Sequence, residues 1–327
     1  MDIGKKYLEF ERPIEKIEKE IEYLQERKKR DFVDTQLEIT KLQQQLVDKT
    51  KEIFFNLTPW QKVQLARHPN RPRTLDYIQK IFEEFIELHG DRIYGDDPAI
   101  VSGIGKFQGI SIGFVGHQKG KDTKENLVRK FGMAHPEGYR KALRIMKLAE
   151  KSHFPVITFI DTPGAHPDIE AETRGQALTI STNLMEMALL QTPILCIIIG
   201  EGGSGGALGI GVGDRVLMQE HSIYSVISPE GCASILWKDQ KAVEEAAKAL
   251  KLTADELFQM GIIDDIIPEP LGGAHRNWNK AIEIVSQYIN KHLKELKTIK
   301  IEELVELRYQ KYRKIGVFKI KEKPSSE

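Results

Sequence analysis

The sequence predicts an α/β fold in which helices cover a largely parallel sheet. Two continuous apolar runs, at residues 156–160 and 194–199, have the length and the β-branched composition of strands buried on both faces. A helical pattern lies between them at residues 172–190, and glycine is dense from about Val101 onward. Because parallel strands need crossover helices, this alternation indicates helices layered on a sheet.

The N-terminal segment, residues 1–57, is rich in Glu, Lys and Gln and predicts a helical hairpin. Residues 30–34 separate its two helices, and Thr35 with Glu38 offers a capping box for the second. Its narrow apolar stripes consist of Ile14, Ile17, Ile21, Leu24, Ile39, Leu42, Leu46 and Ile53. Such a stripe needs a partner, so we interpret residues 1–57 as an assembly arm. A hairpin folded only on its own domain is the alternative.

The remaining elements follow in order along a core predicted to span residues 58–293, with a helical tail at 294–327. Thr58 caps a helix that has Pro59 in its first turn. Residues 106–110 are typical of a hairpin that leads into a strand at 111–115. The other predicted helices are 74–88, 136–150, one beginning at Ala207, 243–250, 257–260 and 279–307, and the other short strands are 215–218 and 222–227.

Composition excludes several classes of protein. The 327 residues carry 48 Lys and Arg against 48 Asp and Glu, which argues against a strongly basic nucleic-acid binder or a membrane-surface protein. Two cysteines, Cys196 and Cys232, exclude a disulfide framework and a cysteine zinc site made by this chain alone. No apolar signal segment begins the chain, and no apolar run approaches the ~20 residues of a membrane helix. We therefore expect a soluble cytoplasmic protein without nucleic-acid or membrane partners.

Two glycine-rich turns follow the two apolar strands and carry the predicted chemistry. The first is DTPGA at residues 161–165, and the second is GEGGSGGA at residues 200–207. Glycine lets backbone N–H groups approach a ligand, and the amides at Gly205 and Gly206 begin a helix. Such amides are suited to stabilising an oxyanion. Turns on successive parallel strands can converge, which predicts one pocket.

Other interpretations share these residues. Ser204, between Gly202 and Gly206, matches the nucleophile elbow of α/β-hydrolases. Its partners would come from Asp214, Asp264, His221 and His275, although no HGGG-type segment precedes it. The DTPG turn also resembles the DxxG turn of GTPases, but residues 115–122 do not form a P-loop, so we reject that interpretation.

Two histidines and one basic stretch are further candidates for a binding site. His117 follows a strand and His166 lies beside the first glycine turn, so either could line a pocket. The basic stretch consists of Lys119, Lys121, Lys124, Arg129 and Lys130. It could contact the phosphates of a nucleotide-like ligand or an acidic partner, although a solvated loop is the more common structure.

Longer strings of residues resemble a known family over residues 8–315. The strings are LEFERPI at 8–14, GHQKG at 116–120, PEGYRKAL at 136–143, RGQ at 174–176, GEGGSGGAL at 200–208, YSVISPEG at 224–231 and PLGGAHR at 270–276. Together they closely resemble the alpha subunits of the bacterial acetyl-coenzyme A carboxylase carboxyltransferase.

The resemblance implies a crotonase-like (ClpP/crotonase superfamily) core and carboxyl transfer from carboxybiotin, held on the biotin carboxyl carrier protein, to acetyl-CoA. The product would be malonyl-CoA for fatty-acid synthesis. It also implies a beta subunit that carries a zinc ribbon, an α2β2 heterotetramer, a biotin carboxylase partner and no metal on this chain. The alternatives are a serine hydrolase acting through Ser204 and a non-catalytic structural subunit.

By this resemblance the amides of Gly205 and Gly206 would hold the biotin ureido oxygen, with Gly164 and Ala165 on the opposing side. Other substrate-binding candidates are Gly202, Gly203, Ser204, His166, His117 and Lys119. The sequence departs from the family pattern at His166, Asp168 and Thr173, around the first glycine turn, and again at residues 133–136. These changes concern the lining of the pocket.

Overall fold

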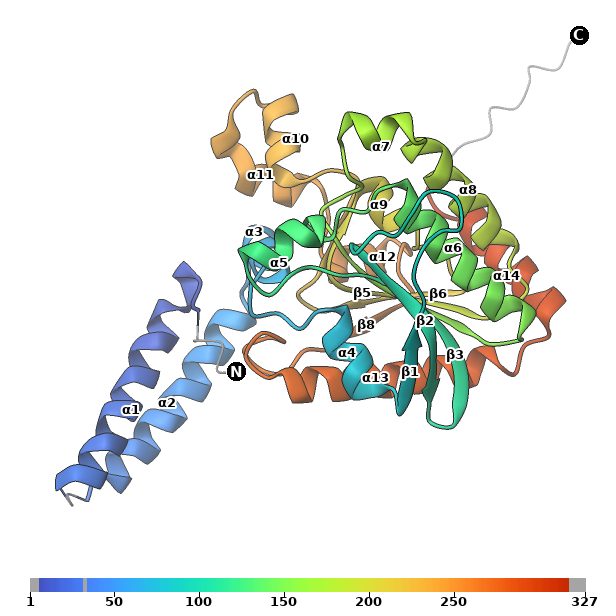
Figure 1. Cartoon of the computed structure of the whole chain (residues 1–327). Coiled ribbons are helices and arrows are strands. Elements are labelled where there is room, and N and C mark those ends of the chain that lie inside the picture. Colours follow the sequence, from blue (N-terminus) through green and yellow to red (C-terminus); the bar gives the residue numbers. More distant parts are fainter. Residues whose placement is uncertain (1–5, 32–33, 318–327) are drawn as a thin grey trace, which may run out of the picture.

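The computed structural model describes residues 6–31 and 34–317, and it places a mixed sheet between two layers of helices (Figure 1). The first five residues, Phe32 and Val33 of the predicted interhelical turn, and residues 318–327 of the predicted tail lie outside the described residues. The strands are β1 Glu84–Glu87, β2 Ile100–Phe107, β3 Ile110–His117, β4 Val156–Thr162, β5 Ile194–Gly203, β6 Arg215–Gln219, β7 Ile223–Ser225 and β8 Asp265–Ile267.

The sheet has the strand order β1-β2-β3-β4-β5-β6-β8, and β7 also pairs with β5. The predicted parallel pairing is confirmed from β3 to β8, whereas β1, β2 and β3 pair antiparallel. The predicted hairpin joins β2 to β3 through Gln108 and Gly109, with φ values of 48° and 77°. Positive φ at both central residues is what a type I′ turn requires.

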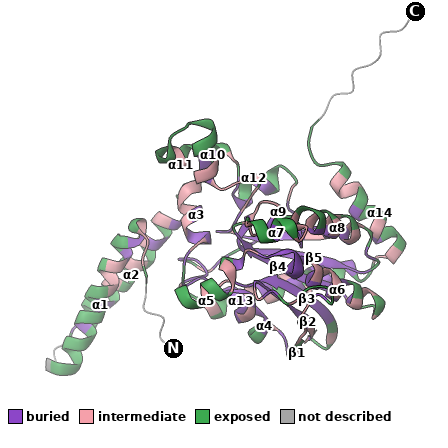
Figure 2. Ribbon diagram, turned by 45° about the horizontal axis from the view of Figure 1, so that its top comes forward, coloured by how far each residue is buried: buried purple, intermediate pink, exposed green. Residues whose placement is uncertain are grey.

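Both faces of the central strands are buried, which explains their continuous apolar sequence (Figure 2). Along β5, Cys196 and Ile198 pack on one side, while Leu195 and Ile197 pack on the other. Helices α6, α8, α9 and α12 contribute to the first side, and α4 and α13 cover the second. The ends of β4 and β5 are therefore fixed between two packed layers.

The helices have the following bounds. They are α1 Arg12–Asp31, α2 Gln36–Phe54, α3 Pro59–Ala66, α4 Thr74–Ile81, α5 Thr123–Val128, α6 Pro136–Lys151, α7 Ile169–Thr173, α8 Gln176–Leu189, α9 Ser204–Leu208, α10 Pro229–Leu236, α11 Val243–Ala249, α12 Ala254–Gln259, α13 Trp278–Leu296 and α14 Ile301–Arg313, with short 3-10 turns η1 Glu9–Glu11, η2 Lys130–Gly132 and η3 Gln240–Ala242.

The predicted helical hairpin is confirmed, and α1 and α2 extend away from the sheet (Figure 1). Ile21 and Leu24 pack against Ile39 between the two helices. The predicted capping box is wrong, because the Thr35 hydroxyl donates 3.3 Å to the Leu24 carbonyl instead of accepting from the start of α2. The side chain of Thr35 therefore ties the second helix to the first.

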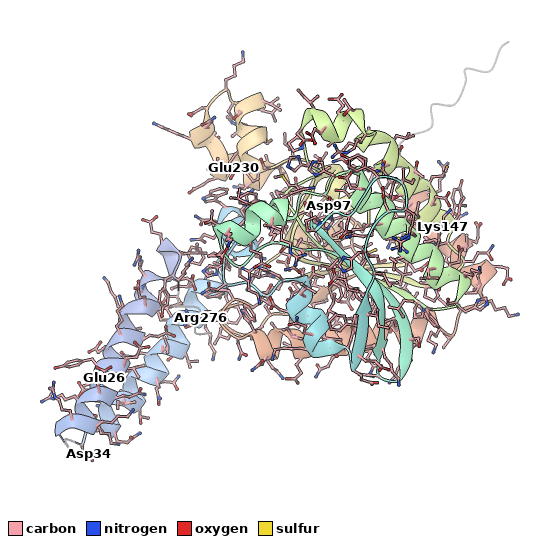
Figure 3. All side chains as sticks on the ribbon, viewed as in Figure 1. Glu26, Asp34, Asp97, Lys147, Glu230 and Arg276 are labelled. Carbon is pink, nitrogen blue, oxygen red and sulfur yellow. The ribbon has the colours of Figure 1, made fainter. Side chains whose placement is uncertain are left out.

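Arg276 holds the base of this hairpin against the core (Figure 3). Its guanidinium donates to Glu18 of α1, and it lies 3.7 Å from the carboxylate of Glu11. His275 contacts the same Glu11 carboxylate at 3.0 Å. Two adjacent residues of the PLGGAHR string thus bind the N-terminal arm.

The helix predicted over residues 74–88 is wrong in its second half. Helix α4 ends at Ile81, and Glu84–Glu87 instead forms the edge strand β1 on β2. Phe82 and Phe85 satisfy helical spacing, but each ring packs against Phe114 of β3. Short apolar segments fit either period, and packing of aromatic rings on the sheet decides the extended form here.

Other predicted bounds shift at particular residues. The helix predicted over 172–190 is broken at Gly175, whose φ of 84° ends α7 before α8 begins. The helix expected from Ala207 begins three residues earlier, and the helix expected from Leu257 begins at Ala254. The strand expected over 222–227 is only β7, while helices α5 and α10 were not predicted.

Within residues 6–31 and 34–317, no helix combines the length and the apolar content that crossing a membrane requires.

Candidate active site

The ends of β4 and β5 bring the two glycine turns into contact, as the sequence predicts. Thr162 pairs with Gly202 across the strands after a register shift. A Cβ added to Gly203 would lie 2.1 Å from the Pro163 carbonyl oxygen, and one on Gly206 would lie 2.4 Å from the Ala165 nitrogen. Only glycine fits at these two positions, because the other turn occupies the space of a side chain.

A cavity of about 610 Å³ opens where the turns meet. It contains five of the predicted site residues, namely Gly164, Ala165, His166, Ser204 and Gly205. Its further lining comes from Met133, Pro163, Pro167, Asp168, Glu172, Gln176, Ala177, Ile180, Val226, Ile227 and Ser228. We refer to it as the turn cavity.

Other predicted site residues lie outside the lining of the turn cavity. Gly202 and Gly206 are buried, and Gly203 packs against the first turn. His117 is fully buried, and its burial, with the charge of nearby Lys119, lowers the pKa of the imidazole to about 3. His117 is therefore neutral at physiological pH. Lys119 lines a neighbouring cavity that shares Pro163 with the turn cavity.

The backbone amides of the two turns differ in their partners. The Gly164 amide donates 3.1 Å to the Thr162 hydroxyl, which in turn donates to the Gly164 carbonyl. Gly164 therefore forms part of the wall of the turn cavity, but its amide already donates to Thr162 and is not free for a ligand. Gly205 and Gly206 lie in the first turn of α9, where amides have no acceptor within their own helix. Of these two residues, Gly205 lines the turn cavity and Gly206 is buried directly behind it.

Ser204 has the backbone of a strained elbow but lacks the partners of a hydrolase. Its φ is 53°, at the junction of β5 and α9. Three of the four predicted triad partners have another side-chain partner in the described structure. Asp214 pairs with Arg308, Asp264 with Lys311, and His275 with Glu11, while the backbone N–H of His221 donates to Glu269. None of the four lines the turn cavity.

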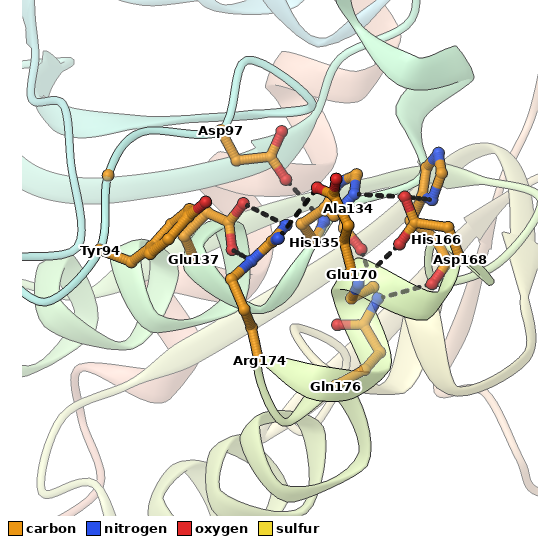
Figure 4. Close-up of polar contacts among 12 residues, drawn as sticks. Tyr94, Asp97, Ala134, His135, Glu137, His166, Asp168, Glu170, Arg174 and Gln176 are labelled. Atoms are coloured by element: carbon orange, nitrogen blue, oxygen red, sulfur yellow. Dashed lines mark hydrogen bonds and ion pairs between the residues drawn. The ribbon is translucent and has the colours of Figure 1, made fainter.

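His166, which lines the turn cavity, stacks on the ring of His135 (Figure 4). The rings of His135 and His166 lie 4.2 Å apart, and His135 Nε2 lies 3.1 Å from Asp168 Oδ2. Burial, with the neighbouring His135, lowers the pKa of His166. Gln176 donates to the carbonyls of Ala134 and His166, which fixes this wall. The sequence marks His166 and Asp168 as departures from the family pattern, but no motif in it predicts their contact with His135.

Arg174 of the RGQ string supports this wall of the cavity from outside (Figure 4). Its guanidinium donates to both carboxylate oxygens of Glu137 at 3.2 and 3.3 Å. It also lies 4.6 Å above the ring of Tyr94. Arg174 therefore joins the segment after α7 to the start of α6. It is a positioning residue, because it holds these two segments in place without lining the turn cavity.

A buried ion network lies behind the second turn. Lys119 Nζ is 2.7 Å from carboxylate oxygens of both Asp161 and Glu201. Arg67 Nε is 2.6 Å from the other oxygen of Glu201. Burial alone would raise the pKa of Glu201, but these two cations keep it below its usual range. The network thus fixes the ends of β4 and β5.

Two groups of side chains bring potential metal ligands within 4.8 Å of one another. The first is Glu11, His68 and His275, and the second is His135, His166 and Asp168. In the second group, His135 Nδ1 accepts from the Lys130 ammonium at 2.7 Å. In the first, His68 Nδ1 accepts the Asn70 amide. These bonds give both groups a role in the fold without an ion.

Comparison with known proteins decides the family. The model of the acetyl co-enzyme A carboxylase carboxyltransferase-like family matches residues 7–316. The chain is 56% identical over 311 residues to the acetyl-coenzyme A carboxylase carboxyl transferase subunit alpha of Halalkalibacterium halodurans, covering 95% of this chain and 96% of that one. The corresponding subunit of Anoxybacillus flavithermus is 54% identical with the same coverage.

The chain belongs to this carboxyltransferase alpha-subunit family. The predicted family and the enzyme class, a carboxyltransferase, are thereby confirmed. The principal functional prediction, the alpha subunit of an acetyl-CoA carboxylase carboxyltransferase in fatty-acid synthesis, is confirmed at the level of the family.

Solved structures support the predicted crotonase-like fold of these alpha subunits. The transcarboxylase 12S crystal structure matches with a TM-score of 0.53 at 19% identity, over 65% of this chain and 41% of that one. The beta subunit of geranyl-CoA carboxylase from P. aeruginosa matches with a TM-score of 0.54 at 15% identity, over 81% of this chain and 48% of that one. At these identities the likeness shows the fold.

Proposed function

We propose that this subunit binds carboxybiotin, carried by a biotin carboxyl carrier protein, in the turn cavity and helps to transfer its carboxyl group to acetyl-CoA. A beta subunit with a zinc ribbon would hold acetyl-CoA, a biotin carboxylase would recharge the carrier, and two copies of each chain would form an α2β2 transferase. The observation that carries the proposal is the pair of amides at Gly205 and Gly206 at the junction of the two turns.

The chemistry needs hydrogen-bond donors more than a side-chain base. When the bond from the ureido nitrogen to the carboxyl carbon breaks, charge develops on the ureido oxygen, and backbone amides fixed by packing stabilise that charge. The ureido nitrogen then accepts the proton that leaves the acetyl methyl group, and the resulting carbanion forms the new bond to the carboxyl carbon. The amides of Gly205 and Gly206 would hold the ureido oxygen throughout.

The remaining candidates would shape the site in this proposal. Gly164 and Ala165 form the wall opposite Gly205, and His166 and Ser204 line the same cavity. Gly203 allows β5 to pass close to the first turn, and Gly202 allows it to pass close to Tyr224 of β7. His117 and Lys119 would support the site without lining the turn cavity. His117 does so as a buried neutral ring, and Lys119 as a member of the buried ion network. We also propose residues 1–57 as an assembly arm, 58–293 as the transferase domain and 294–327 as a helical tail.

Reconstitution tests the proposal. The purified chain is mixed with a beta subunit, and transfer is measured in both directions. Malonyl-CoA formation is followed from acetyl-CoA and carboxybiotinylated carrier, and the reverse transfer from malonyl-CoA to biotinylated carrier. We expect no transfer by the chain alone and transfer by the mixture. Ester hydrolysis by the chain alone would instead support the hydrolase alternative.

Ser204→Gly provides the matched control. Glycine suits the φ of 53° at this position and removes the hydroxyl, so transfer should persist in the variant. Loss of transfer with retained assembly would show that the Ser204 hydroxyl takes part in the reaction and would overturn this expectation. A non-catalytic subunit would tolerate changes at Gly206 as well as at Ser204.

A further inference from the structure

The second cavity lies on the other side of Pro163 from the turn cavity and has a volume of about 320 Å³. Cationic side chains dominate its wall, since Arg67, Arg71, Arg73, Lys119 and Lys121 face Asp161 and Glu201. The predicted basic stretch therefore contributes two residues to a concave site, and we refer to it as the cationic cavity.

Three of these cations are already neutralised by carboxylates. Arg67 is paired with Glu201 and Glu230, and Lys119 with Asp161 and Glu201. Arg71 is fully buried against Glu269, to which it also donates at 3.1 Å through Nη1. These groups build the wall of the cavity, and their charges are accounted for within the protein.

Arg73 is different. Its residue is 5% exposed, and its Nη2 donates 2.6 Å to the Pro69 carbonyl. Its Nη1 is buried and has no hydrogen-bond partner among the described residues. Burial lowers the pKa of Arg73, and the nearby charges of Asp76 and Asp161 oppose this only in part. A buried guanidinium with unused donors carries a desolvation cost that an anion in the cavity would offset.

Lys121 adds a second donor at the same cavity. Its side chain is 53% exposed, and its Nζ lies 3.4 Å from Asp76, a longer ion pair than those of Lys119. Its ammonium can therefore turn toward a ligand by giving up only this long ion pair. A planar guanidinium beside a mobile ammonium is a combination that recognises phosphate oxygens.

We propose that the cationic cavity binds a phosphate group, with Arg73 and Lys121 as the donors that contact it. The group can be inorganic phosphate or a phosphate ester carried by a coenzyme. This site is separate from the amides of the turn cavity and does not depend on their role in carboxyl transfer.

Calorimetric titration of the full-length chain with inorganic phosphate, in a chloride buffer of constant ionic strength, tests the site. We expect saturable binding of one equivalent. Arg73→Met should abolish it, and Lys121→Glu should weaken it by about tenfold or more, because repulsion replaces a charge-assisted bond. Lys121 is half-exposed, so its variant remains informative if Arg73→Met does not fold.

Lys124→Glu is the matched control, since Lys124 is an exposed residue of α5 that borders a different cavity. It makes the same charge change and should leave phosphate binding within twofold of the wild type, roughly the effect of a screened remote charge. Equal weakening by Lys124→Glu and Lys121→Glu would overturn the proposal, as would phosphate binding unchanged in Arg73→Met and Lys121→Glu.

Coenzyme A and 3′-dephospho-coenzyme A distinguish the source of the phosphate. Tighter binding of coenzyme A, with the difference lost in Lys121→Glu, identifies an esterified phosphate. Binding of inorganic phosphate without that difference identifies the free ion. Absence of saturable binding for all three probes would overturn the proposal.

Discussion

Arg308 and Asp214 form a two-pronged ion pair inside the protein. Arg308 Nε lies 2.9 Å from Asp214 Oδ1 and Nη2 lies 2.8 Å from Oδ2, with at most 2% of either side chain exposed. The other guanidinium bonds go to the carbonyls of Met187, Leu190 and Thr192. One side chain thereby secures helix α14 to the end of α8 and to the start of β5.

Removing this guanidinium should strongly destabilise the chain. We expect Arg308→Ala to lower the free energy of unfolding by about 3–5 kcal/mol, because Asp214 is left as a buried charge without its partner. Urea denaturation measures the change. Arg313→Ala, an exposed site on the same helix, should change stability by less than about 0.5 kcal/mol. A loss of under about 1 kcal/mol in Arg308→Ala would contradict this account.

Adjacent glycines in the second turn should respond differently to one methyl group. A Cβ on Gly206 would lie 2.4 Å from backbone atoms of the first turn, while one on Gly205 would meet only Ile180 at 3.8 Å. We therefore expect Gly206→Ala to reduce malonyl-CoA formation by about a hundredfold or more, because the donors lose their geometry. Gly205→Ala keeps its amide and should retain most of the activity.

The assay for this pair is the reconstituted transferase, with assembly followed by size-exclusion chromatography. Both variants should assemble with the beta subunit. Comparable rates for the two alanine variants would show that the spacing of the turns does not control transfer.

Acidification should weaken the contact between the N-terminal arm and the core. Burial, with the neighbouring His275, lowers the pKa of His68 to about 4 from 6.5. A histidine whose pKa is lower in the folded state binds protons preferentially when unfolded. The contribution of neutral His68 to the free energy of unfolding is therefore complete above pH 6.5. It disappears as the pH falls toward 4, and its magnitude is roughly 3 kcal/mol.

Denaturation curves at pH 7, 5.5 and 4 measure this dependence. In His68→Gln the slope between pH 6.5 and 4 should be shallower than in the wild type. His153→Gln, whose ring is outside this cluster, is the control, and equal slopes in all three proteins would refute the role of His68.

Lys119 should contribute chiefly to structure. Its ammonium bridges Asp161 and Glu201 across the ends of β4 and β5. Lys119→Met should cost about 3–5 kcal/mol of stability by leaving two buried carboxylates with less compensation. Adding Glu201→Gln should cost less than the sum of the single changes, because the two residues share one network. Additive losses in the double-mutant cycle would argue against the bridge.

The sequence predicts those parts of the site that depend on local patterns. The strands before both glycine turns follow from their apolar runs, and the contact of the turns follows from parallel pairing. By contrast, His135 and Asp168 are 33 residues apart, and no period or motif indicates that they meet. The sequence does not predict the edge strand β1, because Phe82 and Phe85 fit the spacing of a helix as well as that of a strand. Their packing against the ring of Phe114 favours the strand.

The interlocked turns also have a consequence for how this enzyme can evolve. Gly203 lies against Pro163, and Gly206 lies against Ala165, so each loop forms part of the steric boundary of the other. A substitution that displaces one loop changes which residues the other can tolerate. The two segments, about 40 residues apart in sequence, should therefore show strong epistasis, and libraries that vary both together should recover active variants that single-loop libraries miss.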